Sequence, residues 1–552
     1  MGAYLIAQVA EAERFNVVKG FLNIVVSDVY WIHFLREVAT QPGYGRQPSN
    51  GKKIMVEFSS PNTNKPLHLG HIRNILLGWS TARIMDAVGY DVINVQVIND
   101  RGIAICKSML AWQKYGNGAT PTSTTIKPDH FVGFYYVQFE QYFRQEYSDW
   151  QQTEEAASVY KNHAKADETA TDFFKRYKDT YFNSYSQLGQ EARNMLLAWE
   201  AGDEDTVALW RQMNNWVYAG FDTTYNSLGV SFDKLYYESD TYLLGKEMVE
   251  KGLASGVFYN CEDGSVEVDL TDAKLDKKKI LRSDGTSLYI TQDLGTAHQR
   301  YVDYSIDKMV YVVADEQNYH FQVLFEVLKK LGEPYADGLY HLSYGMVDLP
   351  TGKMKSREGT VVDADDLVAE VVEEVRMNAQ ERDTLTDLAE EDRERIMHQV
   401  GLAALKYYIV KVHPKKRMTF NPQESVDLQG QTGPYIQNAY VRIQSVLRKW
   451  DGLSANQAID YTTLVPEEKE LIQLLFAYPD AILQAANEYD PSTIAQFAYS
   501  LAKTYHKFYH EHSILNADSN AARDFRLMLS QAVADSLKSS MDMLGIEMPE
   551  RM

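Results

Sequence analysis

The sequence is poor in cysteine and has no long apolar run, and each of these features excludes some classes of protein. Only Cys106 and Cys261 occur among 552 residues, which argues against a disulfide framework and a multi-cysteine zinc site. No segment approaches the roughly 18 to 20 apolar residues that a membrane-spanning helix needs. The start MGAYLIAQVAEAERFN lacks the basic region of a secretory signal. We therefore expect a cytoplasmic protein with no membrane association and no zinc.

Basic residues are the minority, and the net charge of −21 disfavours binding of nucleic acid over the whole surface. A local basic patch, HPKKR at 413–417, leaves room for a nucleic-acid partner. Apolar residues make up 45% and aromatic residues 12%, which is enough for well-packed cores. A chain of 552 residues is expected to divide into about three or four domains.

A strand, a turn and a helix are predicted in succession from residue 52. KKIMVEFSS reads as a buried strand, IRNILLGWSTARIMDAVG has apolar residues at helical spacing, and DVINVQVIN reads as a second strand. His68, Gly70 and His71 fall in the turn, where a helix N-terminus offers free N–H groups to a phosphate. A single histidine more often caps or packs, but two around a glycine favour a phosphate site.

The remaining pattern predicts a divided sheet and a helical end. Helical text rich in Tyr and Phe interrupts the sheet pattern, which returns as GTSLYITQDLGTAHQRY, predicted as a strand into a helix, and as KMVYVVADEQNYHFQVLFEVLKKLG. The fold class expected is α/β, with a split Rossmann-like parallel sheet, a helical insertion and a C-terminal all-α bundle. The predicted boundaries are 1–48, 49–120 (first half of the sheet), 121–235 (insertion), 236–365 (second half), 366–400 (connecting helices) and 401–552 (bundle).

The segment GMVDLPTGKMKSREGTVVDADDL, 345–367, carries a short basic cluster made of Lys353, Lys355 and Arg357. Such a loop suits a polyphosphate, because ammonium and guanidinium groups form strong hydrogen bonds to phosphate oxygens. Taken alone, it is equally well explained as a solvated loop.

The histidine turn and the basic loop together resemble the HIGH and KMSKS signatures of class I aminoacyl-tRNA synthetases. Five stretches in order sharpen the resemblance to arginyl-tRNA synthetase of bacterial type: EFSSPNTNKPLHLGHIRN, RSDGTSLYITQDLGTAH, YVVADEQNYHFQVLFEVL, GPYIQNAYVRIQSVL and LGIEMPERM. The resemblance covers roughly residues 15–552. It implies an arginine–tRNA ligase that forms arginyl-adenylate from L-arginine and ATP, with Mg²⁺ on the phosphates, and then charges tRNA(Arg).

The resemblance also implies which residues handle ATP. His68 and His71 would stabilise charge on the α-phosphate, while Lys353 and Arg357 would hold pyrophosphate. The loop departs from the family signature at Lys355 and Arg357, so Lys65, Lys355 or Arg357 replaces the missing lysine. The implied ATP-binding set is His68, Gly70, His71, Gly345, Met346, Val347, Lys353, Lys355 and Ser356, and the implied catalytic set is Lys65, His68, His71, Lys353 and Arg357.

Two further residue sets follow from the resemblance, one for arginine and one for tRNA. A permanently charged guanidinium requires acidic partners, and Asp293 is expected to take it. The implied arginine set is Glu57, Ser60, Asn62, Tyr289, Asp293 and Gln317. The implied tRNA set is Lys415, Lys416 and Arg417 on the backbone, with exposed Tyr435, Gln437, Asn438 and Arg442 on anticodon bases. Residues 1–48 are expected to be the remnant of a domain that meets the tRNA elbow, and a monomer is expected.

Three alternatives are weighed against this reading. The first is another class I synthetase. The missing zinc-ligand cysteines argue against the cysteine type, and an acidic rather than basic pocket argues against the glutamate type. A tRNA-binding paralogue without activity is opposed by the intact His68, Gly70, His71 and Lys353. A small-molecule adenylyltransferase with the same turn would have no use for a C-terminal bundle.

Overall fold

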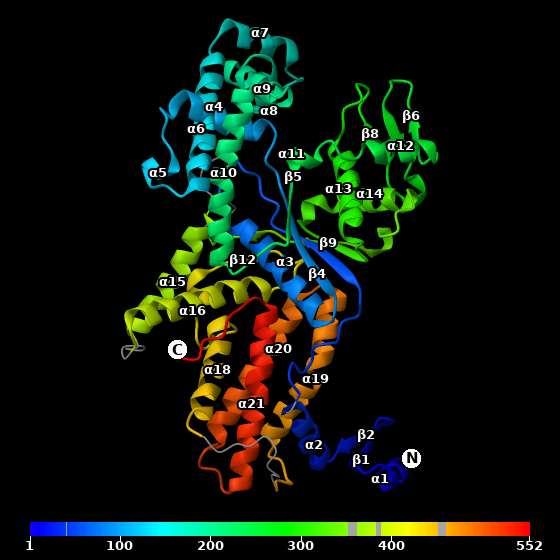
Figure 1. Ribbon diagram of the computed structural model, residues 1–552, viewed down its shortest axis with the longest axis vertical. Coiled ribbons are helices and arrows are strands. Elements are labelled where there is room, and N and C mark those ends of the chain that lie inside the picture. Colours follow the sequence, from blue (N-terminus) through cyan, green and yellow to red (C-terminus); the bar gives the residue numbers. More distant parts are fainter. Residues whose placement is uncertain (40, 351–361, 382–387, 451–459) are drawn as a thin grey trace.

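The computed structural model describes residues 1–39, 41–350, 362–381, 388–450 and 460–552. The molecule is elongated, with a helical insertion at one end, a sheet in the middle and a helical bundle at the other end (Figure 1). No helix among these residues is long and apolar enough to cross a membrane.

A five-stranded parallel sheet in the order β10-β9-β3-β4-β5 forms the centre. Strands from the two halves of the chain are neighbours, since Glu57 of β3 pairs with Val95 of β4 and with Tyr311 of β9. The split sheet predicted from the sequence is therefore confirmed, and the carboxyl ends of β3, β4 and β9 meet at one edge. The bounds are β3 Lys53–Glu57, β4 Asp91–Ile98, β5 Lys234–Tyr237, β9 Lys308–Ala314 and β10 Leu339–Tyr344.

The helical insertion lies between β4 and β5, as Figure 1 shows. Several of its helices begin at side chains that accept backbone N–H groups, such as Thr153, Thr169, Ser186 and Asp203. A cluster of stacked aromatic rings fills its interior. The helices are α4 Ile103–Tyr115, α5 Pro121–Thr124, α6 Pro128–Trp150, α7 Glu154–His163, α8 Ala170–Ser184, α9 Gln187–Glu200 and α10 Glu204–Ser227.

A smaller unit follows β5, and here one prediction is wrong. The segment 285–301 was predicted to begin as a strand, but it contains only an isolated bridge at Ser287 before helix α13 starts at Tyr289. Asp284 accepts the N–H and hydroxyl of Thr286, which forms a turn instead. The elements are α11 Glu238–Thr241, α12 Lys246–Ala254, β6 Phe258–Asn260, β7 Val266–Val268, β8 Lys278–Leu281, α13 Tyr289–Tyr304 and α14 Asn318–Lys330.

The C-terminal part is a helical bundle, as predicted. Asp490 begins a helix by accepting the N–H of Ser492 at 3.0 Å, as its Asp-Pro-Ser sequence indicates. Helix α16 runs without a break through residue 401, where a domain boundary was expected. The elements are β11 Val347–Asp348, α15 Ala364–Glu381, α16 Glu390–Val410, β12 Met418–Thr419, α17 Pro422–Ser425, α18 Gly433–Leu447, α19 Pro466–Glu488, α20 Pro491–Glu511 and α21 Asn520–Met543.

The N-terminal segment forms a small hairpin beside the bundle (Figure 1). Its strands β1 Ala12–Val18 and β2 Phe21–Val26 pair antiparallel, between helices α1 Gly2–Gln8 and α2 Asp28–Ala39. The segment RFNVVKGFLNIVVSD thus contributes most of this strand pair. Lys469 of α19 binds Asp28 at 2.9 Å, which fixes the start of α2 to the bundle.

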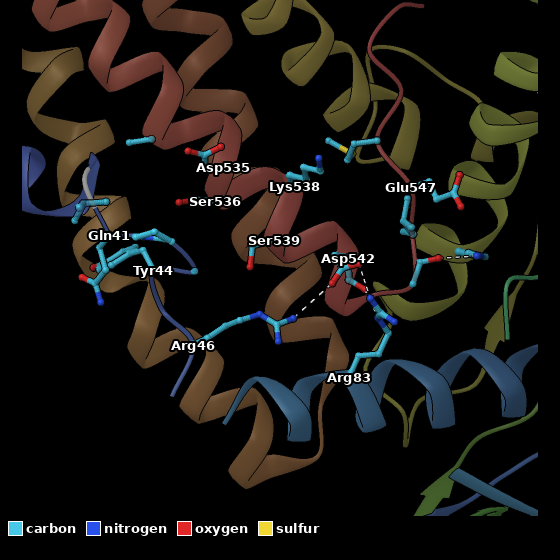
Figure 2. Close-up of a pocket in the computed structure, with 18 of the residues that line it drawn as sticks. Gln41, Tyr44, Arg46, Arg83, Asp535, Ser536, Lys538, Ser539, Asp542 and Glu547 are labelled. Atoms are coloured by element: carbon cyan, nitrogen blue, oxygen red, sulfur yellow. Dashed lines mark hydrogen bonds and ion pairs between the residues drawn. The ribbon is translucent and has the colours of Figure 1, made fainter. Parts of the chain in front are cut away.

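Helix α3, Leu69–Ala87, joins the sheet to the bundle, because its residues share one apolar core with α16, α19 and α21. At its C-terminal turn a cavity of about 900 Å³ opens between the two parts. Figure 2 shows Arg46 and Arg83 both directed at Asp542 of α21 in this cavity. Arg83 also donates from Nε to the Asp542 carbonyl at 2.6 Å.

Candidate active site

His68 and His71 lie at the start of α3, the helix that follows the central strand β3. His68 is the N-cap residue of α3, and its Nδ1 accepts the Gly70 N–H at 3.1 Å. The His71 Nδ1 accepts the His68 N–H at 3.1 Å. Because both Nδ1 atoms accept, a neutral ring carries its proton on Nε2. Each imidazole therefore offers an Nε2–H donor, and the two rings lie 3.9 Å apart.

Burial keeps both histidines neutral. Burial, with nearby Lys65, lowers the pKa of His68 to about 4. Burial also lowers the pKa of His71 well below its ordinary value, and the neighbouring His68 and Lys65 act in the same direction. The turn thus presents neutral hydrogen-bond donors at pH 7, fixed before any ligand arrives.

Gly70 allows this arrangement. A Cβ at residue 70 would lie 3.0 Å from Cε1 of the His68 ring, so a side chain there would crowd the imidazole. The backbone of the turn is further held by Asn74, whose amide donates to the Val312 carbonyl at 2.7 Å. The turn is therefore tied to the end of β9.

The basic loop predicted to bind polyphosphate lies outside the described residues, and with it Lys353, Lys355, Ser356 and Arg357. Its two flanks are described. Before it, Val347 pairs with Met418 of β12. After it, the Ala364 N–H donates to the Leu67 carbonyl at 3.0 Å, and the Leu69 N–H donates to the Val362 carbonyl at 3.2 Å. The chain therefore re-enters beside the histidine turn.

Gly345, Met346 and Val347, expected to bind ATP, run against the basic patch 413–417. The Gly345 N–H donates to the Pro414 carbonyl at 2.9 Å, and a Cβ at residue 345 would lie 2.7 Å from the Arg417 nitrogen. Only glycine permits so close a backbone contact.

Lys65 lines a cavity of about 300 Å³ beside the histidine turn. His68 and Asp363 form one wall, and His130 and Phe134 of α6 form another. Lys65 is half-buried, and its charge contributes to the low pKa of both histidines. The structure thus places Lys65 next to the turn, as the sequence spacing indicated.

Glu57 is held by an internal partner rather than left open. Its Oε2 lies 2.5 Å from Nη1 of Arg300, which is fully buried on α13. Its Oε1 accepts the Ser60 hydroxyl at 3.3 Å, and the Ser60 Oγ accepts the Val97 N–H at 3.2 Å. Glu57 and Ser60 therefore shape the floor at the end of β3, and their contact with a substrate stays a prediction.

Asp293 is the more open carboxylate. Its side chain is 45% exposed, and its Oδ2 lies 2.6 Å from Nε2 of His320 on α14. Tyr289, one helical turn earlier, is 78% exposed. Asn62 and Gln317 are exposed too. These four side chains lie at the open edge of the sheet and are accessible to a ligand.

Sequence reasoning missed several residues of this edge. Glu238 is one, because burial raises its pKa; Arg101 opposes this, while the carboxylates of Asp100 and Asp293 act in the same direction as burial. His320, which positions Asp293, is another. Ser59, also missed, and Ser60, which was expected, adopt left-handed backbone with φ of 71° and 44°, a strain common at functional sites. Of these, only Glu238 carries a local sequence signal, because it directly follows the end of β5.

The residues expected on tRNA divide into two groups. Lys415, Lys416 and Arg417 are exposed, and buried Arg73 of α3 holds their loop through the Pro414 and Lys416 carbonyls. The four residues of α18 were expected to be exposed, and this is wrong. Gln437 is fully buried, since its amide donates to the Glu547 carbonyl at 2.8 Å. Tyr435, Asn438 and Arg442 are half-buried.

Two family models match the chain. Residues 35–421 match the tRNA synthetases class I (R), catalytic domain, and residues 436–552 match the DALR anticodon binding domain. The two matches divide the chain where the sheet and its helices give way to the bundle.

Curated relatives match over the whole chain. The chain is 50% identical to an arginine–tRNA ligase of Parabacteroides distasonis and 51% identical to one of Bacteroides thetaiotaomicron, covering all of this chain and 90% of each relative. Among solved structures, an arginyl-tRNA synthetase of Thermus thermophilus matches with a TM-score of 0.78 at 25% identity, over 98% of this chain and 89% of that one. On the paired histidines, the split sheet and these matches, the chain belongs to the arginyl-tRNA synthetase family of class I tRNA synthetases.

Proposed function

We propose that this chain is an arginine–tRNA ligase. It activates L-arginine with ATP to arginyl-adenylate, with release of pyrophosphate, and transfers the arginyl group to the 3′-terminal adenosine of tRNA(Arg). The observation that carries the proposal is the pair of neutral Nε2–H donors of His68 and His71 at the head of α3. A class I synthetase uses ATP, and the full-length relatives share this activity by name.

The first step adds negative charge to the α-phosphate as the arginine carboxylate attacks. The two Nε2–H groups stabilise that charge, and they need no reorganisation because backbone N–H groups fix both rings. The helix N-terminus adds its own partial positive charge. When bound with ATP, Mg²⁺ would shield the charge of the phosphates. Lys65 lines the same cavity as His68 and contributes a compact ammonium group that also stabilises the charge on the phosphates.

Selectivity for arginine rests on the carboxylates at the edge of the sheet. Asp293 takes the guanidinium, because its side chain is exposed. His320 binds one of its two carboxylate oxygens and so fixes the orientation of the group. Glu57, Ser60, Asn62, Tyr289 and Gln317 complete the pocket, with Asn62 and Gln317 on the amino-acid end. Glu57 acts through its Arg300-bound carboxylate, which leaves its charge largely compensated.

The tRNA meets the protein at two places. Lys415, Lys416 and Arg417 contact its backbone, since phosphate contacts need exposed cations. Tyr435, Asn438 and Arg442 of α18 contact the anticodon from a half-buried position. The protein acts in the cytoplasm as a monomer, without zinc.

Pyrophosphate exchange into ATP tests the proposal. It is measured with each of the twenty amino acids, with and without total tRNA. Arginine alone should support exchange, and the family resemblance predicts that exchange is weak until tRNA is added. Exchange with a different amino acid, or none with arginine and tRNA, would overturn the proposal.

A further inference from the structure

Asp363 links the histidine turn to the helical insertion. Its neighbours pair with the turn, through the Ala364 N–H to the Leu67 carbonyl at 3.0 Å and the Leu69 N–H to the Val362 carbonyl at 3.2 Å. Its Oδ1 accepts the Asp365 N–H at 2.8 Å and so begins α15. One residue therefore fixes both the edge of the turn and the start of the helix.

The other oxygen of Asp363 binds the insertion. Its Oδ2 lies 3.0 Å from Nε2 of His130, the third residue of α6, and the same nitrogen lies 3.4 Å from Oδ2 of Asp365. These side chains are largely buried, with 28% of His130 and 11% of Asp363 exposed. The close carboxylates of Asp363 and Asp365 raise the pKa of His130 to about 10, so it is an imidazolium at neutral pH.

A second contact reinforces the first. Lys127 lies 2.5 Å from Oδ2 of Asp365, and the Thr224 hydroxyl of α10 donates to the other oxygen of Asp365 at 2.9 Å. Two helices of the insertion, α6 and α10, thus hold the start of α15. Figure 1 places α15 next to the end of the insertion that faces the sheet.

The same cluster could be taken for a metal site, since Asp129, His130 and Asp365 have ligand atoms within 4.8 Å of one another. Lys127 argues against it, because its ammonium lies 3.3 Å from Asp129 and 2.5 Å from Asp365. The cation that such carboxylates need is already supplied by a side chain. The cluster is a network of internal ion pairs.

We propose that His130 is a positioning residue for amino-acid activation, which holds Asp363 and through it the turn that carries His68. This inference rests on the proposed function. The turn is paired on one side with the Asp363 strand segment, so a shift of Asp363 shifts His68. Displacement of a reacting group by about 1 Å can cost on the order of a hundredfold in rate. The insertion therefore sets the geometry of the phosphate donors without touching the substrate.

Steady-state pyrophosphate exchange on full-length variants tests this inference. His130→Gln keeps a polar side chain but removes the cation, and we expect kcat to fall about tenfold or more while KM for arginine stays within about twofold. His130→Lys restores a cation and should be faster than His130→Gln. The matched control is His512→Gln, because His512 makes an equivalent contact of 3.1 Å with Glu467 in the bundle.

A double-mutant cycle with Asp363→Asn separates positioning from general stability. Asparagine keeps the oxygen that begins α15 but loses the charge that His130 binds. If His130 acts through Asp363, the double variant should be no slower than the slower single variant. Independent, multiplying losses would overturn the inference.

Two failures are distinguishable. If the wild-type chain shows no arginine-dependent exchange, the proposed function fails. If the wild type is active and His130→Gln has a kcat within about twofold of it, or falls no further than His512→Gln, the positioning role of His130 is wrong.

Discussion

At the scale of single residues, the side chains of the site are held in place by neighbouring residues of the protein. His68 and His71 are half-buried and neutral, because loss of solvent lowers their pKa, and their Nδ1 atoms are occupied by backbone donors. Glu57 is neutralised by Arg300, whereas Asp293 keeps an open oxygen beside His320. The two carboxylates therefore differ in role, and Asp293 is the one that a guanidinium can still pair with.

Replacement of Asp293 by Asn tests that difference. Asparagine can still accept from His320 but carries no charge, so arginine affinity should fall by about 2 kcal/mol or more. KM for arginine in pyrophosphate exchange measures the change. Asp303→Asn on the same helix is the control, since Asp303 binds Tyr236 away from the edge. Near-normal arginine affinity in Asp293→Asn would refute the pocket assignment.

Lys65 is expected to supply a positive charge to the phosphates during adenylate formation. A guanidinium at residue 357 is broad and planar, so it does not replace a compact ammonium, and another lysine is needed at the phosphates. Lys65→Ala should lower the rate of adenylate formation by roughly a hundredfold or more while tRNA affinity is unchanged. Lys52→Ala, at an exposed lysine before β3, is the control. A single-turnover rate within about threefold of wild type would point to Lys355 or Arg357 instead.

At the scale of elements, most of the architecture could be predicted and some contacts could not. The strand, turn and helix at 52–89 were predictable because buried strands and 3.6-residue periodicity leave local signals. The strand predicted at residues 285–288 was wrong, because the spacing of Leu288 and Ile290 is the alternation of a strand. In the structure, Ile290 and Leu294 are both buried and lie one turn apart on α13. Gln437 could not be predicted as buried, since its partner is the Glu547 carbonyl, 110 residues away.

The junction of α6 and α15 gives a pH prediction. His130 faces Asp363, Asp365, Asp129 and Lys127, and the close carboxylates of Asp363 and then Asp365 raise its pKa to about 10. A raised pKa stabilises the fold fully below the unfolded value of about 6.5, and this contribution is lost as pH rises through 10. The difference in thermal midpoint between wild type and His130→Gln should therefore be constant below pH 6.5 and shrink toward pH 10. A difference that is the same at pH 6 and pH 10 would contradict this.

At the scale of the whole molecule, the bundle and the sheet are joined mainly by packing through α3. The ion pairs of Asp542 with Arg46 and Arg83 lie at a half-exposed site, with 49% of Asp542 exposed. Exposed pairs contribute little, so packing is expected to dominate.

Two substitutions compare these contributions. Asp542→Ala should lower the free energy of unfolding by only about 0.2 to 1 kcal/mol. Gly545→Val should cost more, because Gly545 has φ of +68° and its Cβ would lie 2.6 Å from the Trp79 ring of α3. Thermal unfolding of both variants measures the order. A larger loss in Asp542→Ala would show that the ion pairs hold the two parts together.

The most direct test of the central claim is charging of tRNA by the purified chain. Each of the twenty amino acids is supplied with ATP, Mg²⁺ and total tRNA, and aminoacylated tRNA is separated from uncharged tRNA. Arginine alone should give charged tRNA, and His68→Ala should abolish most of that charging while leaving the fold intact. Charging with another amino acid, or an unchanged rate in His68→Ala, would contradict the account.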